Sequence, residues 1–136
     1  MTYNILPATT LAAAVTGSHS ATTYVTRPFQ SALIAATFVR AGGGTTCRAW
    51  VQCSADRGTT WHDVCNFYFE TTTINAFFNI SGLTAVTSVG TPTDGTAANN
   101  ASVDGTVTNT WRVKYTTTGT YTGASSIAIW ICTRDT

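Results

Sequence analysis

Apolar and polar residues alternate along most of the chain, so neighbouring side chains fall on opposite faces as they do in a β-strand. The stretch TCRAWVQCS, Thr46–Ser54, is the clearest case, because small apolar residues occupy every second position. In SALIAATFVRA, Ser31–Ala41, both sets of alternate positions are apolar, which predicts a strand covered on both faces. The other predicted strands are Trp61–Glu70, Asn75–Ile80, Trp111–Tyr115 and Ser126–Arg134.

Turn-forming residues separate these segments. A Gly-containing turn joins Thr46–Ser54 to Trp61–Glu70, which predicts a β-hairpin. The stretch from Ser81 to Asn109 is rich in Gly, Thr, Asn, Ala and Asp, and because it is long for a loop we expect short strands or a projecting loop within it. About seven or eight strands, with turns about every 8–12 residues, indicate a sandwich or barrel. We therefore predict an all-β fold, a single-domain antiparallel β-sandwich of jelly-roll-like form.

The first segment, residues 1–24, differs from the rest because it is rich in Ala and Thr and shows only weak alternation. One interpretation is a frayed end or a first edge strand. The other is an extended arm that docks on a neighbouring subunit through Tyr3, Ile5 and Leu6. The residues favour neither interpretation over the other. The domain prediction is an N-terminal extended arm over residues 1–24, followed by a β-sandwich domain over residues 25–136.

Composition supports a β-fold and argues against several kinds of partner. Thr accounts for about a fifth of the 136 residues, whereas the helix formers Glu and Lys occur once each. Charged residues make up 10% of the chain and the net charge is +1, so we expect no nucleic-acid or anionic-membrane partner. No cationic segment precedes the first apolar residues and no apolar run reaches membrane-spanning length, so we expect neither a signal peptide nor a membrane span.

The four cysteines, Cys47, Cys53, Cys65 and Cys132, form no C-x-x-C pair, and the chain has only two histidines. Metal sites are built from such ligands at characteristic spacings, so we expect no metal and no other cofactor. All four cysteines fall in predicted strands, which favours buried, reduced thiols. One disulfide within the group Cys47, Cys53 and Cys65 remains open.

The segment SADRGTTW, Ser54–Trp61, resembles the Asp-box, a short hairpin motif known from sialidases and other glycan-handling propellers. In such a turn Asp56 would accept hydrogen bonds from backbone amides, Gly58 would adopt a positive φ, and Trp61 would pack against the hairpin. Ser54 would add a local hydrogen bond. Sialidases repeat the motif, whereas this chain has one copy, so we expect Ser54, Asp56, Gly58 and Trp61 to be structural turn residues.

Candidate catalytic groups are sparse. A glycosidase needs two acids on one cleft, but Asp63 and Glu70 fall on opposite faces of their predicted strand. His62 adjoins Asp63 and also points away from it, so we predict no Ser/His/Asp or Cys/His site and no enzymatic activity. We place His62 on the surface beside Trp50, across the hairpin. Trp50 and Tyr68 form either an exposed aromatic patch for a sugar or a partner, or a pair beneath a covering layer.

Three stretches together resemble small structural proteins of tailed bacteriophages, namely AWVQCSADRGTTWHDVCNFYF, TPTDGTAANNASVDG and WRVKYTTTGTYTG. The resemblance covers most of the chain from Ser31 onward and supplies no catalytic residue. It implies a virion component, in first place a capsid decoration or cement protein that stabilises the phage head. The implied partners are the major capsid protein and further copies of the chain, as a homotrimer, in virions assembled in the cytoplasm of the bacterial host.

The composition agrees with such a role, because arms and sheet edges of a weakly charged β-protein can pair with neighbouring subunits. We expect the contacts in Tyr3, Ile5 and Leu6 of the arm and in the loop Pro92–Asn100. A neck, tail or baseplate protein is the alternative within the virion. A carbohydrate-binding β-sandwich that uses Trp50 and Tyr68 is the alternative from another class.

Overall fold

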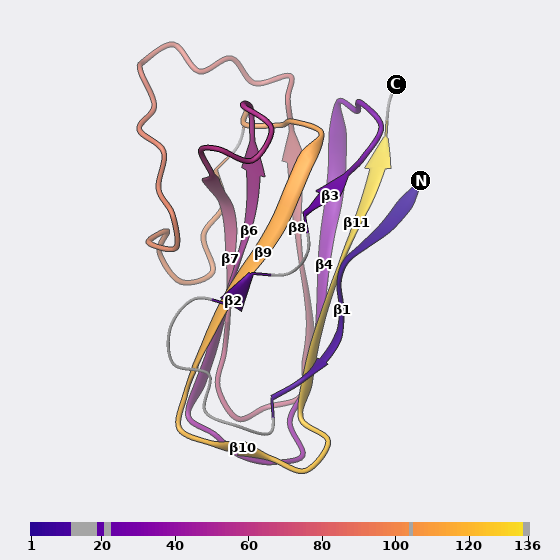
Figure 1. Cartoon of the computed structure of the whole chain (residues 1–136), viewed down its shortest axis with the longest axis vertical. Coiled ribbons are helices and arrows are strands. Elements are labelled where there is room, and N and C mark those ends of the chain that lie inside the picture. The colour runs from indigo at the N-terminus through magenta and orange to yellow at the C-terminus, as the bar shows by residue number, and fades with distance from the viewer. Residues whose placement is uncertain (12–18, 21–22, 104, 135–136) are drawn as a thin grey trace.

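The computed structural model describes residues 1–11, 19–20, 23–103 and 105–134, which form antiparallel β-sheets packed against each other (Figure 1). The all-β sandwich predicted from the sequence is confirmed. Among these described residues there is no helix that could cross a bilayer. The strands are β1 (Thr2–Thr10), β2 (His19–Ser20), β3 (Tyr24–Val25), β4 (Ser31–Val39), β5 (Gly42–Gly43), β6 (Thr46–Ser54), β7 (His62–Phe69), β8 (Ile74–Ser81), β9 (Thr110–Thr118), β10 (Tyr121–Thr122) and β11 (Ser126–Arg134).

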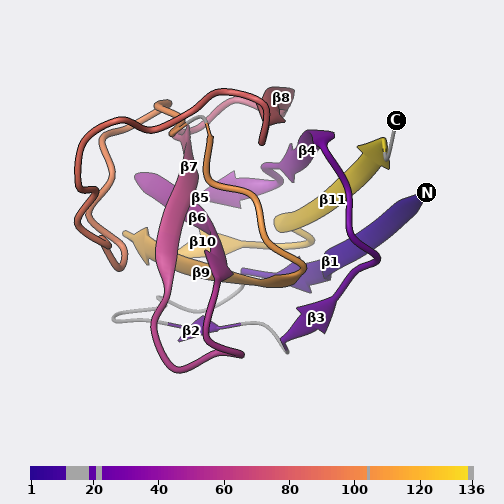
Figure 2. The same ribbon diagram turned by 90° about the horizontal axis from the view of Figure 1, so that it is seen from above.

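The strand order is that of a jelly roll. Sheet 1 has the order β1-β11-β4-β8, and sheet 2 has the order β9-β6-β7 with β2 and β3 both paired to the outer side of β9. The antiparallel pairs β1–β11, β3–β9, β4–β8 and β6–β7 join the first half of the chain to the second. Successive pairs fall in alternate sheets, which is how a jelly roll folds one long ribbon over itself. The two layers are visible from above in Figure 2.

The core lies between the two sheets and receives one face of each long strand. Phe38 of β4 stacks on Phe69 of β7 across the sandwich, with ring centroids 4.8 Å apart, and Tyr121 meets Phe38 edge-on. The Tyr121 hydroxyl donates a hydrogen bond of 2.6 Å to the Glu70 carbonyl. Burial raises the pKa of Tyr121 to about 12, so this hydroxyl remains a donor. These aromatic contacts tie the end of the molecule at β5 and β10 to the end of β7.

The amino-terminal segment belongs to the sandwich wherever the structure describes it. β1 pairs with β11, and the side chains of Ile5 and Leu6 are 0% and 3% exposed in the core. Tyr3 is half-buried and packs against the same core. The edge-strand interpretation therefore holds for residues 2–10. Ile5 and Leu6 are corrected from partner contacts to core residues, because their apolar area is buried within their own chain. Residues 12–18 and 21–22 of the predicted arm lie outside the described residues.

All four cysteines are free. Cys47, Cys53 and Cys65 are buried in the core, whereas Cys132 is exposed on the outer side of β11, so the expected burial holds for three of them. Burial raises the pKa of Cys47 to about 12 and that of Cys53 to about 11. These thiols therefore stay protonated at neutral pH and pack as small apolar side chains.

Candidate functional site

A β-bulge in β7 determines where Asp63 points. In the β6–β7 hairpin, Val51 lies opposite Cys65, but the next residue of β6, Gln52, lies opposite Asp63. Val64 is thus the extra residue of the bulge. In an uninterrupted strand, Asp63 would share a face with Cys65, which is buried in the core. The bulge instead moves Asp63 to the outer face of sheet 2, beside Gln52.

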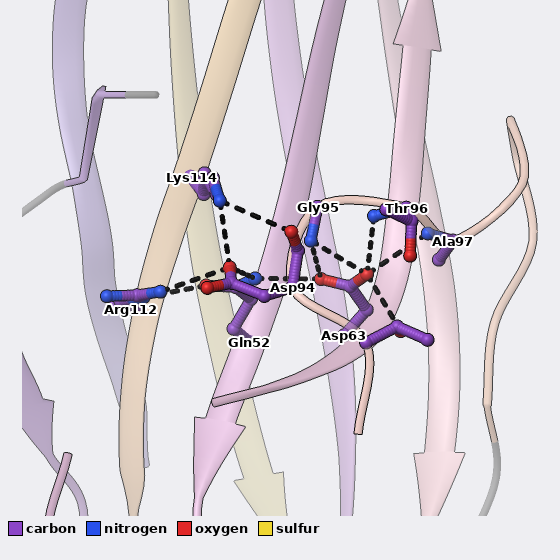
Figure 3. Close-up of polar contacts among 9 residues, drawn as sticks. Gln52, Asp63, Asp94, Gly95, Thr96, Ala97, Arg112 and Lys114 are labelled. Carbon is purple, nitrogen blue, oxygen red and sulfur yellow. Dashed lines mark hydrogen bonds and ion pairs between the residues drawn. The ribbon is translucent and has the colours of Figure 1, made fainter. Parts of the chain in front are cut away.

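On that outer face, the Asp63 carboxylate holds the long loop 82–109 against sheet 2 (Figure 3). The residue is only 3% exposed. Its hydrogen-bond donors, at 2.8–3.0 Å, are the backbone N–H groups of Gly95, Thr96 and Ala97, the hydroxyl of Thr93 and the side-chain amide of Gln52. Burial opposes the negative charge, but these donors outweigh it and hold the pKa of Asp63 below its usual value. Asp63 is therefore an ionised, fully coordinated anchor for the loop.

Asp94 makes the second part of the contact, from the loop toward β9. Gln52 Nε2 donates to Asp94 Oδ1 at 2.8 Å, so this one amide group bridges both carboxylates. Lys114 Nζ and Arg112 Nη2 approach the same oxygen at 2.9 and 3.2 Å. The Gln52 hydrogen bond lowers the pKa of Asp94 most, and the two cations add to it against the opposing effect of burial. A neutral amide and two cations thus fix the Asp94–Gly95 turn on the sheet.

Arg112 connects this network to the turn at residues 54–61. Its guanidinium carbon lies 4.3 Å from the ring centroid of Trp61, a cation–π distance. Asp56 Oδ1 accepts a hydrogen bond of 2.6 Å from a backbone N–H of the turn and one of 2.8 Å from Ser54 Oγ, which lowers the pKa of Asp56 to about 2. Gly58 has a φ of 93°, and its N–H donates to Ser54 Oγ. The hydrogen bonds of Asp56 and Gly58 are internal to the turn, so these residues stabilise its conformation.

The same loop covers Trp50. This residue is 7% exposed, and its indole Nε1 donates to the Ala97 carbonyl at 3.2 Å. Tyr68 remains half-buried, with its hydroxyl donating to Glu70 Oε1 at 3.0 Å and the Arg48 guanidinium 5.5 Å from its ring centroid. The covering-layer interpretation therefore holds for Trp50, and the two aromatic residues do not form one exposed platform.

Further along, the loop runs beside β7 and pairs with its outer edge (Figures 1 and 2). The Val103 N–H donates to the Val64 carbonyl at 2.7 Å, and the Asn66 N–H donates to the Ala101 carbonyl at 2.9 Å. An isolated β-bridge forms at Ser102. Among its described residues the loop contains no named strand, so it belongs to the projecting-loop alternative. Its main effect here is to cover the edge of sheet 2.

His62 and Asp63, the residues considered for catalysis, are surrounded by groups that stabilise the fold. His62 is half-buried opposite Cys53, which corrects its expected position beside Trp50. His62 and Asp63 both border a cavity of about 320 Å³, but the Asp63 oxygens are already bound by their own loop. Within the described residues, no group of three or more His, Cys, Asp or Glu side chains is placed to hold a metal ion. The chemical effect of this network is to fix a loop.

The outer face of sheet 1 contrasts with that of sheet 2. Its four strands contain a single charged residue, Arg134 near the end of β11. Phe77 of β8 lies opposite Ala35 of β4, which lies opposite Trp130 of β11, so these side chains form a row across the sheet. We refer to Leu33, Ala35, Phe77, Trp130 and Cys132 as the apolar face.

Several side chains of the apolar face are open to solvent. Phe77 is 69% exposed and Leu33 is 41% exposed. The prediction that β4 is covered on both faces is therefore wrong for its outer face at Leu33. The sequence could not distinguish a covering layer within the chain from a surface that is left uncovered, because both give the same apolar pattern.

No family model matches the chain, and neither a curated protein nor a solved structure matches it. Jelly rolls occur in viral capsid proteins, lectins and cupins, so the topology alone does not select one function. The surfaces and contacts described above are the basis of the proposal that follows.

Proposed function

We propose that the chain is a virion structural protein of the capsid decoration or cement type, which stabilises a phage head by binding capsid subunits. The apolar face is the observation that carries this proposal. A solvated sheet surface normally alternates apolar core positions with charged or polar outer ones, whereas this one presents Phe77, Leu33 and Trp130 outward with one charge nearby. Such a surface favours contact with another protein.

The contrast between the two outer faces supports the same conclusion. On sheet 2, Asp63 and Asp94 fasten the chain's own loop over Trp50 and Gln52, which leaves that face polar and covered by the chain itself. On sheet 1, no described segment covers the apolar face. The jelly-roll topology also agrees with the proposal, because this fold recurs among viral capsid proteins.

A cement function follows from such a surface by mass action. A protein that binds the assembled shell and not the free subunits shifts the equilibrium toward the shell. Many copies on a symmetric lattice add avidity to contacts that are individually weak. Neither step requires a catalytic group, and the Asp56, Asp63 and Asp94 carboxylates are each engaged by donors of their own chain.

The direct test is imaging of phage particles, assembled in cells that make this chain, with gold-labelled antibody against it. We expect label over the whole head. Label confined to the neck or tail supports the alternative of a neck, tail or baseplate protein, and an absence of label contradicts a virion role.

A variant locates the contact. Leu33→Lys places an ammonium group in the middle of the apolar face, where a partner would bury it without a counter-ion. We expect the particle-bound fraction to fall by about tenfold or more. The matched control is Val89→Lys, because Val89 is 99% exposed in the loop that follows β8 and is not part of the apolar face. Equal binding of the two variants would place the contact elsewhere.

A further inference from the structure

We propose that β8 is a self-pairing edge, through which two copies of the chain join antiparallel about a twofold axis at Phe77. The two copies of sheet 1 then form one continuous sheet. This inference rests on the edge of sheet 1 and does not depend on the proposed function.

The other three edges of the two large sheets, sheet 1 and sheet 2, are protected against pairing with a second chain. β1 contains Pro7 and two register irregularities, and both features interrupt an edge. The outer edge of β7 is occupied by the loop through Ala101 and Val103. On the opposite side of sheet 2, β2 and β3 are only two residues long each. Among the described residues, the usual devices that prevent edge-to-edge association are therefore present at β1, at β7 and at β2 and β3, whereas most of β8 lacks them.

Over Ile74–Ile80, β8 has none of these devices; at its last residue, the Ser81 carbonyl accepts a hydrogen bond of 2.9 Å from the Gly105 N–H of the loop. The strand runs for eight residues, Ile74–Ser81, in unbroken register with β4, and it contains neither proline nor a charged residue. Among the described residues, its named strand partner is β4 alone. A long, regular and uncharged edge strand is a ready template for another strand.

The direction of the backbone groups identifies which residues would pair. The Gly82 N–H donates to the Gln30 carbonyl at 2.7 Å, so the backbone of residue 82 faces the β4 side. Backbone N–H and C=O groups alternate in direction along a strand, so those of Asn75, Phe77 and Asn79 face away from β4. Within the described part of the chain, no backbone hydrogen bond outside the β4–β8 ladder involves these three residues. A second strand could pair with all of them.

The sequence of β8 complements itself in the antiparallel direction. With the twofold axis at Phe77, this residue lies opposite its own copy, and its backbone groups face the partner as such an axis requires. The remaining opposed pairs are Ile74 with Ile80, Asn75 with Asn79, and Ala76 with Phe78. Aromatic and amide pairs of this kind stabilise neighbouring strands, and no like charges oppose each other. A second copy of this chain therefore fits the edge better than an arbitrary peptide.

The space beside the strand also fits. A groove of about 490 Å³ borders β8 and is lined in part by Tyr68, Ile74, Ala76 and Asn100. The small Ala76 side chain leaves room there for Phe78 of the second copy. On the opposite side of the strand, Phe77 is 69% exposed and is free to meet Phe77 of the second copy.

The pairing has a consequence for the whole assembly. It is an isologous, twofold contact, so it predicts a dimer in place of the trimer expected from the sequence. It also brings the apolar faces of both copies to the same side of one continuous sheet.

The test measures the mass of the purified full chain by light scattering and by sedimentation velocity. We expect a dimer for the wild type and a monomer for Phe77→Lys, because two ammonium groups then face each other at the axis. Mixing Phe77→Lys with Phe77→Glu should restore a dimer that contains one copy of each. Val89→Lys, which adds the same charge at a fully exposed loop position, should remain dimeric.

Cross-linking provides a second measurement of the axis. In a Cys132→Ser background, Phe77→Cys should form a dimer disulfide under mild oxidation, because a hydrogen-bonded antiparallel pair places the two Cα atoms about 5.5 Å apart. Val89→Cys should not cross-link at a comparable rate. A monomeric or trimeric wild type, or a dimer that Phe77→Lys leaves intact, would overturn the proposal.

Discussion

At the scale of single residues, the best-defined polar feature is the coordination of Asp63. Five residues donate to this one carboxylate, and three of the donors are consecutive backbone N–H groups, Gly95 to Ala97, of the loop. These N–H groups belong to a covering loop, and without the carboxylate they would be left with poor partners. The side chain therefore holds residues 93–97 on sheet 2, together with the contacts of Asp94 and Trp50.

The charge on Asp63 makes stability depend on pH. Because the native pKa of Asp63 is lowered, the unfolded chain binds more protons at acidic pH and protonation favours unfolding. The stabilisation is complete above the unfolded pKa of about 3.9 and is lost as the pH falls through the native value. We expect the free energy of unfolding, from urea titrations followed by tryptophan fluorescence, to fall below about pH 4. Asp63→Asn should lose about 1–3 kcal/mol at neutral pH and show a weaker acid dependence.

Part of the acid dependence should survive in Asp63→Asn, because the pKa values of Asp56 and Asp94 are also lowered. Glu70→Gln is the control, since it removes an exposed carboxylate that holds no loop. An acid dependence in Asp63→Asn identical to that of the wild type would contradict the anchoring role.

At the scale of strands, the treatment of sheet edges is the main feature. The loop covers β7, bulges and Pro7 interrupt β1, and β8 is regular and open over Ile74–Ile80. β1 is nevertheless integral to sheet 1, because its apolar residues complete the core beside β11. A detachable arm would have its apolar residues in solvent until a partner arrived.

Truncating a core residue of β1 distinguishes these possibilities. Ile5→Ala should lower the free energy of unfolding by about 2–5 kcal/mol, because Ile5 is fully buried and the substitution leaves a cavity. Val25→Ala is the matched control in an edge strand of sheet 2, and with Val25 67% exposed it should cost about 0.5 kcal/mol or less. Urea unfolding curves measure both. An Ile5→Ala variant as stable as the control would favour the detachable arm.

At the scale of the whole molecule, the sandwich separates a closed side from an open side. The closed side is sheet 2 beneath its loop, and the open side is the apolar face of sheet 1. The cysteines are divided in the same way. Cys47, Cys53 and Cys65 are buried between the sheets, whereas Cys132 is exposed on the open side.

Thiol modification should therefore measure the integrity of the sandwich. A small alkylating reagent at neutral pH should add one group to the folded chain, at Cys132, and four groups in denaturant, as read by mass spectrometry. The core thiols are both inaccessible and protonated, because burial raises their pKa values. The control is Cys132→Ser, which should remain unmodified when folded. Modification of the core cysteines as fast as Cys132 would show that the sheets separate readily.

Local patterns in the sequence were sufficient for the fold class and for most strands. Thr46–Ser54 and Ser126–Arg134 were predicted with the bounds that the structure has, because alternation and flanking turns are properties of neighbouring residues. The same is true of the turn at Ser54–Trp61, where the motif carries its own hydrogen bonds.

The tertiary structure decided everything that depends on pairing between distant segments. The bulge at Val64 forms where β7 pairs with β6, and it moves Asp63 to the opposite face of the strand. The hydrogen-bond donors for Asp63 on that face come from residues 93–97 of the loop. Gln52, Arg112 and Lys114 carried no signal in the sequence, because their common partner Asp94 is distant in the chain. Burial of Ile5 likewise requires β11, more than a hundred residues away along the chain.

By itself the sequence determined that this chain forms strands of a sandwich, because periodicity is local. Which faces are covered and which edge stays open required the fold, because burial is a property of contacts between segments.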